Sequence, residues 1–336
     1  MWSKVCRRQP RIHTRLRGSP IPRASLGGTA VKWIIDTDPG IDDAAAIITA
    51  IRSGLDVIAI TAVHGNTPLK FTTRNALILT EVLDVPTPVH AGAERPLLQP
   101  PLAAAEVHGS DGFGDAGLPP PKRALATQHA VDRIIEAAHQ YPGNLSILAV
   151  GPLTNVALAI AKDRSITGKI HQLVIMGGTS HAQGNTSIVG EFNVLADPEA
   201  AAIVFEAGIP ITLVPWETTT KAVIPAAALE RLRGSASPVA EMFLTISKPL
   251  REITRRFLGA EGMVLCDLVA AAVAVDAGIM TEHVHTYVGV ETGGTLARGL
   301  TAVDYARLSG RQPNATVCLG VDVGKLTDLF VQAITA

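Results

Sequence analysis

Apolar residues along the chain form short runs that alternate with longer amphipathic segments. Short apolar, β-branched runs bounded by Gly, Pro or Asp are typical of buried strands. Such runs occupy residues 31–35, 56–63, 145–150, 173–176 and 211–214. The intervening Ala-, Leu- and Ile-rich segments predict helices at residues 42–52, 69–83, 128–140, 153–161 and 198–207. This alternation favours parallel strands joined by right-handed crossovers.

The predicted fold class is therefore α/β: an open, mostly parallel, doubly wound sheet with helices on both faces. No linker-like segment interrupts the alternation, so residues 31–336 are expected to form one large domain. Residues 1–30 are rich in Arg, Ser, Pro and Gly and show no apolar periodicity. We expect them to form a basic, disordered extension of that domain.

Charge is distributed unevenly along the 336 residues. The first 35 residues carry eight basic and no acidic side chains, which leaves 21 basic and 30 acidic ones, a net charge of −9, in residues 36–336. An acidic body argues against nucleic acid as a partner. No apolar run is long enough to span a bilayer. Three widely separated cysteines and no CxxC pair favour a reducing compartment, the cytoplasm.

Four carboxylates follow the first predicted strand within eight residues, and no Lys or Arg lies between positions 32 and 52. They are Asp36, Asp38, Asp42 and Asp43. One or two acids at this point are explained by capping of the helix that follows. Four acids repel one another, and a hard cation bound through oxygen atoms relieves that repulsion. The loop also lies at the carboxyl end of a strand, where open α/β sheets bind ligands.

The segment Asp36-Thr-Asp38-Pro-Gly-Ile-Asp42-Asp43-Ala resembles the amino-terminal signature of the inosine-uridine-preferring nucleoside hydrolases. Further similarities follow in the family's order. They are His64-Gly-Asn66, Gly151-Pro-Leu-Thr-Asn155, Met176-Gly-Gly178, Glu191-Phe-Asn193, Asp197-Pro-Glu-Ala-Ala201, Glu291-Thr-Gly and the segment from Arg298 to Asp304. The resemblance covers about residues 31–336 and identifies them as a nucleoside hydrolase-like catalytic domain.

The resemblance implies calcium-dependent hydrolysis of the N-glycosidic bond of ribonucleosides to free base and ribose. It assigns the Ca²⁺ ligands to Asp38, Asp43, Asp267 and the backbone carbonyl of Val150. Asp42 would be the general base that takes a proton from a metal-bound water. The positions that match substrate-binding residues of the family are Asn66, Met176, Asn185, Glu191, Phe192 and Asn193. Relatives are commonly homodimers or homotetramers, so the same is expected here.

These assignments agree with the chemistry of the bond. Its cleavage passes through a positively charged, oxocarbenium-like sugar, which neighbouring carboxylates stabilise. Calcium accepts several oxygen ligands, and a bound cation lowers the pKa of water. Amide and carboxylate groups that bind the ribose hydroxyls would be left unpaired by a deoxyribose, which favours ribonucleosides.

The chain departs from the family at the residue that protonates the leaving base. Relatives commonly have His directly before the late aspartate ligand, whereas this chain has Cys266. A thiol can donate a proton or simply pack. His108, in Val107-His-Gly-Ser-Asp-Gly, matches a loop histidine near the base and is the alternative donor. The helical stretch 237–258 offers Arg251, Arg255 and Arg256 where some relatives place aromatic residues.

Two other functions stay open from the sequence. The first is a nucleoside- or ribose-binding protein that has lost turnover because Cys266 replaces the acid. The retained Asp42 argues against it. The second is a haloacid-type phosphatase in which Asp36 and Asp38 act as nucleophile and acid with magnesium. The chain offers no matching lysine-bearing or second acidic motif, and purine or pyrimidine preference is not decided by the sequence.

Overall fold

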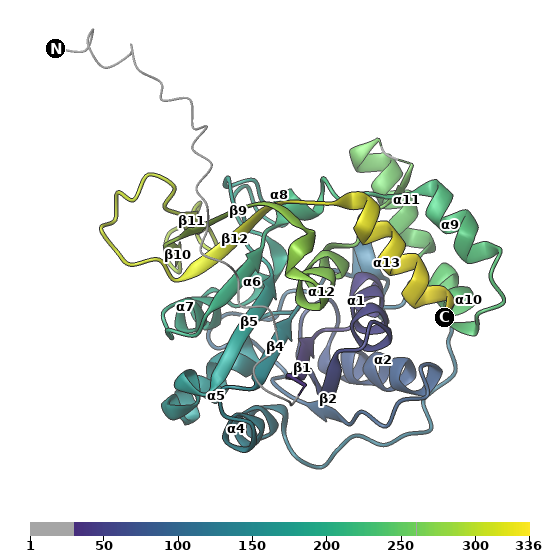
Figure 1. Ribbon diagram of the computed structural model, residues 1–336, viewed down its shortest axis with the longest axis horizontal. Helices are drawn as coiled ribbons and strands as arrows, with labels where there is room; N and C mark the ends of the chain where they lie inside the picture. Colours follow the sequence, from purple (N-terminus) through teal and green to yellow (C-terminus); the bar gives the residue numbers. More distant parts are fainter. Residues whose placement is uncertain (1–29, 260) are drawn as a thin grey trace, which may run out of the picture.

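The computed structural model describes residues 30–259 and 261–336, so the basic extension of residues 1–29 lies outside the described part. A central eight-stranded sheet organises this part of the chain (Figure 1). Its spatial order is β3 (Val89–Ala91), β2 (Asp56–Ala62), β1 (Lys32–Thr37), β4 (Leu145–Ala149), β5 (Ile170–Met176), β6 (Ile211–Val214), β12 (Ala315–Val321) and β9 (Met280–Thr286). All neighbours pair in parallel except the edge strand β9, which runs antiparallel to β12.

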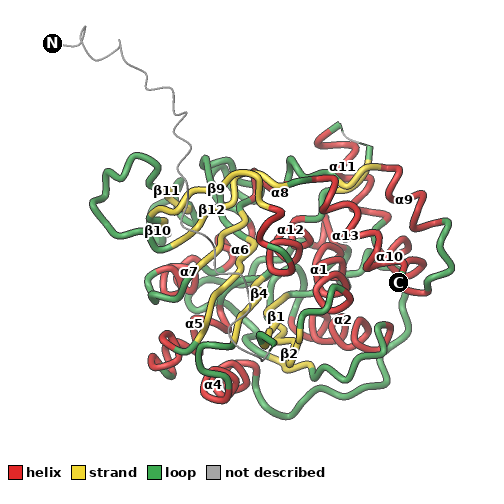
Figure 2. The backbone as a smooth tube through the Cα atoms, in the orientation of Figure 1, coloured by secondary structure: helices red, strands yellow, loops and turns green. Residues whose placement is uncertain are grey.

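Helices cover both faces of this sheet, as the sequence predicts (Figure 2). Side chains alternate across each strand, so Trp33 and Ile35 enter one hydrophobic core while Ile34 enters the other. The first core is covered by α1 (Ile41–Arg52), α2 (Leu69–Val82), α9 (Ala226–Arg233), α10 (Pro238–Ile246), α12 (Cys266–Val275) and α13 (Val323–Thr335). The second is covered by α4 (Ala130–Gln140), α5 (Thr154–Lys162) and α7 (Pro198–Phe205).

The remaining elements of the described chain lie outside this central arrangement of sheet and covering helices. They are the helices α3 (Ala105–His108), α6 (Phe192–Ala196), α8 (Trp216–Thr219) and α11 (Lys248–Leu258), the 3₁₀ turns Arg164–Gly168 and Ala277–Ile279, and the two-stranded sheets β7 (Ile224–Pro225) with β8 (Gly262–Met263) and β10 (Val288–Val290) with β11 (Thr301–Val303). Among the described residues, no helix combines the length and the apolar character that a membrane crossing requires.

The strand order reverses between β1 and β4. From β1 the chain builds outward through β2 and β3, whereas β4, β5 and β6 lie on the other side. In a doubly wound sheet, the loops after two such strands diverge and leave a crevice at their carboxyl ends. The loop with Asp38 follows β1, and Val150 and Gly151 follow β4. The topology therefore places the acidic loop at the expected ligand-binding position.

The helical stretch predicted for residues 237–258 is interrupted in the structure. It forms α10 and α11, which are separated by Ser247. Pro249 lies in the first turn of α11, where its missing N–H needs no partner and its ring fixes a new helix start.

Candidate active site

The start of α1 holds the acidic loop in place through its own backbone. Asp43 accepts hydrogen bonds from the Thr37 hydroxyl at 2.5 Å and the Gly40 amide at 2.9 Å, and so caps the helix. The backbone N–H of Asn66 donates to Asp38 Oδ2 at 2.6 Å, and the side-chain Nδ2 of Asn66 donates to Asp43 Oδ2 at 3.1 Å. The loop after β2 thus fixes the orientation of two of the four aspartates.

A third element, α12, brings Asp267 to the same point. This helix packs closely against α1, and Asp267 lies in its first turn (Figure 1). Carboxylate oxygens of Asp42, Asp43 and Asp267 lie within 4.8 Å of one another. The amino termini of both helices therefore meet at the acidic cluster, where their dipoles favour negative charge.

Burial and mutual repulsion nevertheless favour protonation of this cluster, or a bound cation, over several free negative charges. Burial raises the pKa of Asp42 and of Asp43 to about 6. Burial, then the charge of Asp43, raises the pKa of Asp38 well above its usual range. For Asp267 burial comes first and the charge of Asp42 second. Each shift shows that the folded protein resists several uncompensated negative charges in this space.

The donor atoms fit a hard cation. Asp38 Oδ1 is buried and has no hydrogen-bond partner among the described residues. Two glycines make room for this carboxylate: a Cβ on Gly65 would lie 1.9 Å from Asp38 Oδ2, and one on Gly151 would lie 2.6 Å from Oδ1. Clustered, unpartnered carboxylate oxygens are ligands of the kind that Ca²⁺ and Mg²⁺ prefer. The described residues can therefore hold a divalent metal ion.

A cavity of about 590 Å³ opens above the cluster. Of the residues that the sequence assigns to the site, all but Asp38 and Asp43 line it. The shared set is Asp42, Asn66, His108, Val150, Met176, Asn185, Glu191, Phe192, Asn193, Cys266 and Asp267. The structure thus brings together side chains that lie more than 200 positions apart in the sequence.

The polar residues on the other side of the cavity are fixed by backbone contacts. Asn193 donates through Nδ2 to the carbonyl oxygens of Val150 at 3.1 Å and Met176 at 3.2 Å. Glu191 caps α6 and accepts from the amides of Gly178 at 2.7 Å and Asn193 at 2.9 Å. Burial nevertheless raises the pKa of Glu191 to about 7. These groups form a rigid polar wall facing the aspartates.

Asn185 is held at the mouth of the cavity by a different contact. Its Oδ1 accepts from the Phe192 amide at 2.9 Å, which ties the loop preceding α6 to the start of that helix. Its side-chain amide nitrogen makes no hydrogen bond to a described residue. A donor that lines a cavity in this way is available to a bound molecule.

The two candidate proton donors differ in their surroundings. His108 Nδ1 accepts from the Ile41 amide at 3.1 Å, and burial lowers the pKa of His108 to about 4. The ring is therefore neutral at pH 7, and its 3.9 Å approach to Asp42 is no ion pair. Cys266 Sγ lies 3.3 Å from Thr219 Oγ1, and burial raises the pKa of the thiol well above its usual range.

Asp36 does not reach the cavity. It is fully buried, and its Oδ1 accepts from Thr61 at 2.6 Å and from Asn155 at 2.8 Å. It links β1 to β2 and to α5, and so supports the start of the acidic loop. A haloacid-type phosphatase needs this carboxylate as its nucleophile, so the structure contradicts that alternative.

Several cavity residues have no counterpart in the sequence prediction. Trp216, at the start of α8, and three α11 residues spaced as one helical face, Leu250, Ile253 and Thr254, line the cavity. The i, i+3, i+4 spacing on α11 is a signal that the sequence carries. Trp216 has no such signal, because only the packing of α8 at the end of β6 brings it to the site.

Comparisons with known proteins agree with this geometry. Residues 33–328 match the model of the family described as inosine-uridine preferring nucleoside hydrolase. The chain is 38% identical over 308 residues to a pyrimidine-specific ribonucleoside hydrolase, RihA, from Salmonella gallinarum, covering 91% of this chain and 98% of that protein. It is similar to a plant nucleoside hydrolase of known structure, with a TM-score of 0.86 and 33% identity over 92% of this chain and 100% of the other.

A purine-preferring ribonucleoside hydrolase from Gardnerella vaginalis is also similar, with a TM-score of 0.85 and 30% identity over 90% of this chain and 98% of the other. These matches span almost the entire described chain and include the acidic loop, the cavity and α12. They confirm the family and the enzyme class that the sequence motifs predict. The chain belongs to the inosine-uridine preferring nucleoside hydrolase family.

Proposed function

We propose that this nucleoside hydrolase is calcium-dependent and uses Asp42 as the general base that activates the attacking water. The observation that carries the proposal is the convergence of Asp42, Asp43 and Asp267 beside a cavity lined by the expected sugar-binding residues. Water attacks the anomeric carbon, the N-glycosidic bond breaks, and the base leaves with a proton. The products are free base and ribose.

The proposed Ca²⁺ ligands are carboxylate oxygens of Asp38, Asp43 and Asp267 and the carbonyl oxygen of Val150. All four donors are oxygen atoms, which favours calcium over the softer transition metals. Bound there, the ion supplies a positive charge that lowers the pKa of a water ligand. Asn193 donates to the Val150 carbonyl and so holds this oxygen in a fixed direction.

Asp42 is suited to proton abstraction by its position and its acidity. Unlike Asp38 and Asp43, it lines the cavity, and its pKa of about 6 follows first from burial. Amides of α12, those of Cys266 and Asp267, oppose part of that shift. A base with a pKa near the working pH is ionised and still accepts a proton well.

The sugar is proposed to bind between the aspartates and the opposite wall. Asn66, Asn185, Glu191 and Asn193 would bind its hydroxyls, and Met176 and Phe192 would pack against its carbon atoms. The carboxylates on both sides stabilise the positive charge that develops on the ribose ring. A deoxyribose would leave part of this polar wall unpaired, which favours ribonucleosides.

Steady-state release of ribose from five ribonucleosides tests the proposal. We expect activity with Ca²⁺, none after chelation, and a loss of kcat of about 10²–10⁴-fold in Asp42→Ala. Asp328→Ala, which removes an exposed aspartate on α13, is the matched control and should keep full activity.

Tight nucleoside binding by the metal-loaded protein without any ribose release would instead support a binding protein without turnover. Equal activity of wild type and Asp42→Ala would refute the assignment of the base. Activity that persists in the metal-free protein would refute the metal dependence.

A further inference from the structure

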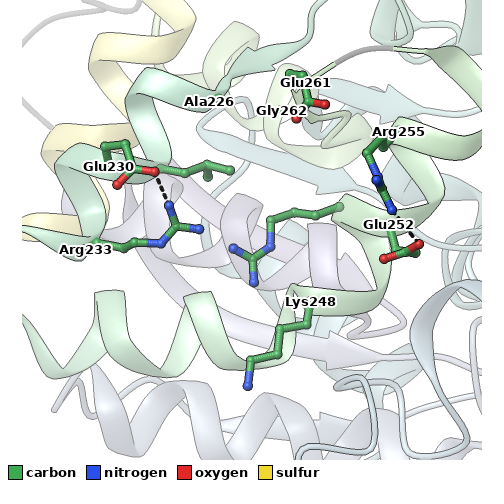
Figure 3. Close-up of a pocket in the computed structure, with 10 residues that line it drawn as sticks. Ala226, Glu230, Arg233, Lys248, Glu252, Arg255, Glu261 and Gly262 are labelled. Atoms are coloured by element: carbon green, nitrogen blue, oxygen red, sulfur yellow. Dashed lines mark hydrogen bonds and ion pairs between the residues drawn. The ribbon is translucent and has the colours of Figure 1, made fainter.

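A second pocket, of about 440 Å³, lies on the side of α11 away from the aspartate cluster. Figure 3 shows its wall: Glu230 and Arg233 from α9 on one side, Glu252 and Arg255 from α11 on the other, and Lys248 at the start of α11. Glu252 is the one residue among those lining this pocket that also lines the catalytic cavity. The two cavities therefore share a wall without sharing the residues of the proposed reaction.

Positive charge in this pocket exceeds what the surrounding acids neutralise. Arg233 pairs with Glu230, and Arg255 pairs with Glu252 at 2.8 Å. Lys248 and Arg251 also line the pocket, and neither forms an ion pair with a described carboxylate. Glu261 is the third carboxylate on the pocket wall, so four cations face three acids and one positive charge remains in excess, with Lys248 and Arg251 outside any ion pair between described residues.

Arg251 has an unsatisfied donor. Its Nη2 donates to the Leu244 carbonyl at 3.2 Å, but its buried Nε has no partner among the described residues. Burial, and then the neighbouring charge of Arg233, lower the pKa of Arg251. Two guanidinium groups close enough to repel each other form an arrangement that an oxyanion stabilises, since forked contacts to oxygen suit Arg best.

Size and the remaining charges restrict the ligand further. The volume is several times that of a phosphate group and falls in the range of small-molecule sites. Three carboxylates, those of Glu230, Glu252 and Glu261, also line the pocket and would repel a long polyanion such as nucleic acid. Carboxylates accept hydrogen bonds from hydroxyl groups. A ligand with one phosphate and several hydroxyl groups can bind the basic side chains through its phosphate and the carboxylates through its hydroxyls.

We propose that the pocket between α9 and α11 binds a small sugar phosphate, whose phosphate lies between Arg233, Lys248 and Arg251. The carboxylates on the pocket wall accept hydrogen bonds from the sugar hydroxyls. This site is separate from the catalytic cavity and does not depend on the proposed metal or on Asp42.

Calorimetric titration of the metal-loaded protein tests the proposal. The probes are ribose 5-phosphate, glucose 6-phosphate and inorganic phosphate, each added in the presence of excess free ribose so that the catalytic cavity is occupied. We expect saturable binding of the sugar phosphates with a Kd below about 1 mM, and weaker binding of inorganic phosphate, which lacks hydroxyls.

Two variants locate the site. Arg233→Gln and Lys248→Gln should each weaken sugar phosphate binding about tenfold or more. The control is Arg231→Gln, two residues away on α9, which removes an equally exposed arginine that pairs with Asp328 outside the pocket. It should change the Kd less than about twofold.

Two results would overturn the proposal: no saturable binding up to about 10 mM, or the same loss of affinity in Arg231→Gln as in Arg233→Gln. Inorganic phosphate binding as tightly as both sugar phosphates would overturn the role of the hydroxyls. Lys248 is exposed and has no charged partner among the described residues, so its substitution leaves the fold intact and keeps the test decisive. Failure here leaves ribose release unaffected and is thus distinguishable from failure of the catalytic proposal.

Discussion

His108 and Cys266 both line the catalytic cavity, but they differ in their hydrogen bonds. The Ile41 amide donates to Nδ1 of His108, so the neutral ring carries its proton on Nε2. The Thr219 hydroxyl donates to the Trp216 carbonyl at 2.8 Å and to Cys266 Sγ at 3.3 Å. Burial raises the pKa of the Cys266 thiol well above its usual range, so this thiol releases its proton less readily than a free cysteine. The Nε2–H group of His108 is therefore the more available hydrogen-bond donor to a departing base.

Substitution of these two residues should therefore have unequal effects. We expect His108→Ala to lower kcat on natural ribonucleosides by about 10²-fold, since the departing base loses the hydrogen bond from the neutral ring that stabilises its developing negative charge. Cys266→Ala should lower it by less than about tenfold, because the thiol packs against Thr219. Steady-state kinetics of both variants measure the difference.

A riboside with a 4-nitrophenolate leaving group provides the control, because this group departs as an anion and needs no proton. Both variants should hydrolyse it nearly as fast as the wild type. A larger loss for Cys266→Ala than for His108→Ala on natural substrates would reverse the assignment, and a loss on the nitrophenyl riboside would point to altered geometry instead.

At the scale of elements, the site depends on how closely the loops after β1, β2 and β4 approach one another. Gly65, in the loop after β2, leaves no space for a Cβ because Asp38 Oδ2 would lie 1.9 Å from it. The neighbouring Asn66 amide bonds that same oxygen at 2.6 Å. Gly65 thus allows the loop after β2 to come close enough to orient the Asp38 carboxylate in the loop after β1.

We expect Gly65→Ala to weaken Ca²⁺ binding by about 10- to 100-fold, because the new methyl group displaces Asp38. Isothermal titration calorimetry with Ca²⁺ measures this loss of affinity. Gly168→Ala is the matched control: no atom lies within 4 Å of its added Cβ, and its calcium affinity should be unchanged. Unchanged affinity in Gly65→Ala would exclude Asp38 from the ligands.

The apolar pattern of the sequence predicts some elements of the fold correctly and misses others. Strands β1, β2, β4, β5 and β6 and helices α1, α2, α4, α5 and α7 could be predicted because their apolar patterns are strong and Gly, Pro or Asp bounds them. The short elements β3, α3 and α6 were not predicted, because three to five residues are too few to show a pattern. The break at Ser247 was not predicted, although the sequence carries its signals: α10 is mostly apolar, α11 is strongly amphipathic, and Pro249 marks the start of a new helix. The role of the acidic loop could be predicted because its aspartates lie within eight residues of one another. The position of Trp216 in the cavity could not be predicted, because only the folded chain brings this residue to the site.

For the whole molecule, the acidic cluster links stability to both protons and metal. The pKa of Asp36 and of Glu191 is raised to about 7 and that of Asp42 and Asp43 to about 6, each primarily by burial. An unfolded chain releases these protons near pH 4. Between about pH 4 and pH 7 the folded, metal-free protein therefore binds more protons, and its free energy of unfolding falls as the pH rises.

We accordingly expect the Tm of the metal-free protein to fall between about pH 5 and pH 7.5. The proposed calcium ion would bind the deprotonated cluster, so the stabilisation that it adds should grow over the same interval and reach about 2.7 kcal/mol at a hundredfold excess over the Kd. Thermal unfolding with calcium and with chelator measures both trends. A metal-free Tm that rises from about pH 5 to pH 7.5 would contradict the role of the buried carboxyl groups.

The position of α11 between two cavities has a thermodynamic consequence. One face of this helix lines the nucleoside cavity through Leu250, Ile253 and Thr254, and the other carries Lys248 and Arg251. If a molecule in one cavity shifts the helix, the affinity of the other cavity changes by some factor. By thermodynamic linkage, a molecule bound in the second cavity then changes the affinity of the first cavity by the same factor. A cell that holds abundant sugar phosphate would then adjust nucleoside affinity, and abundant nucleoside would equally adjust the retention of sugar phosphate.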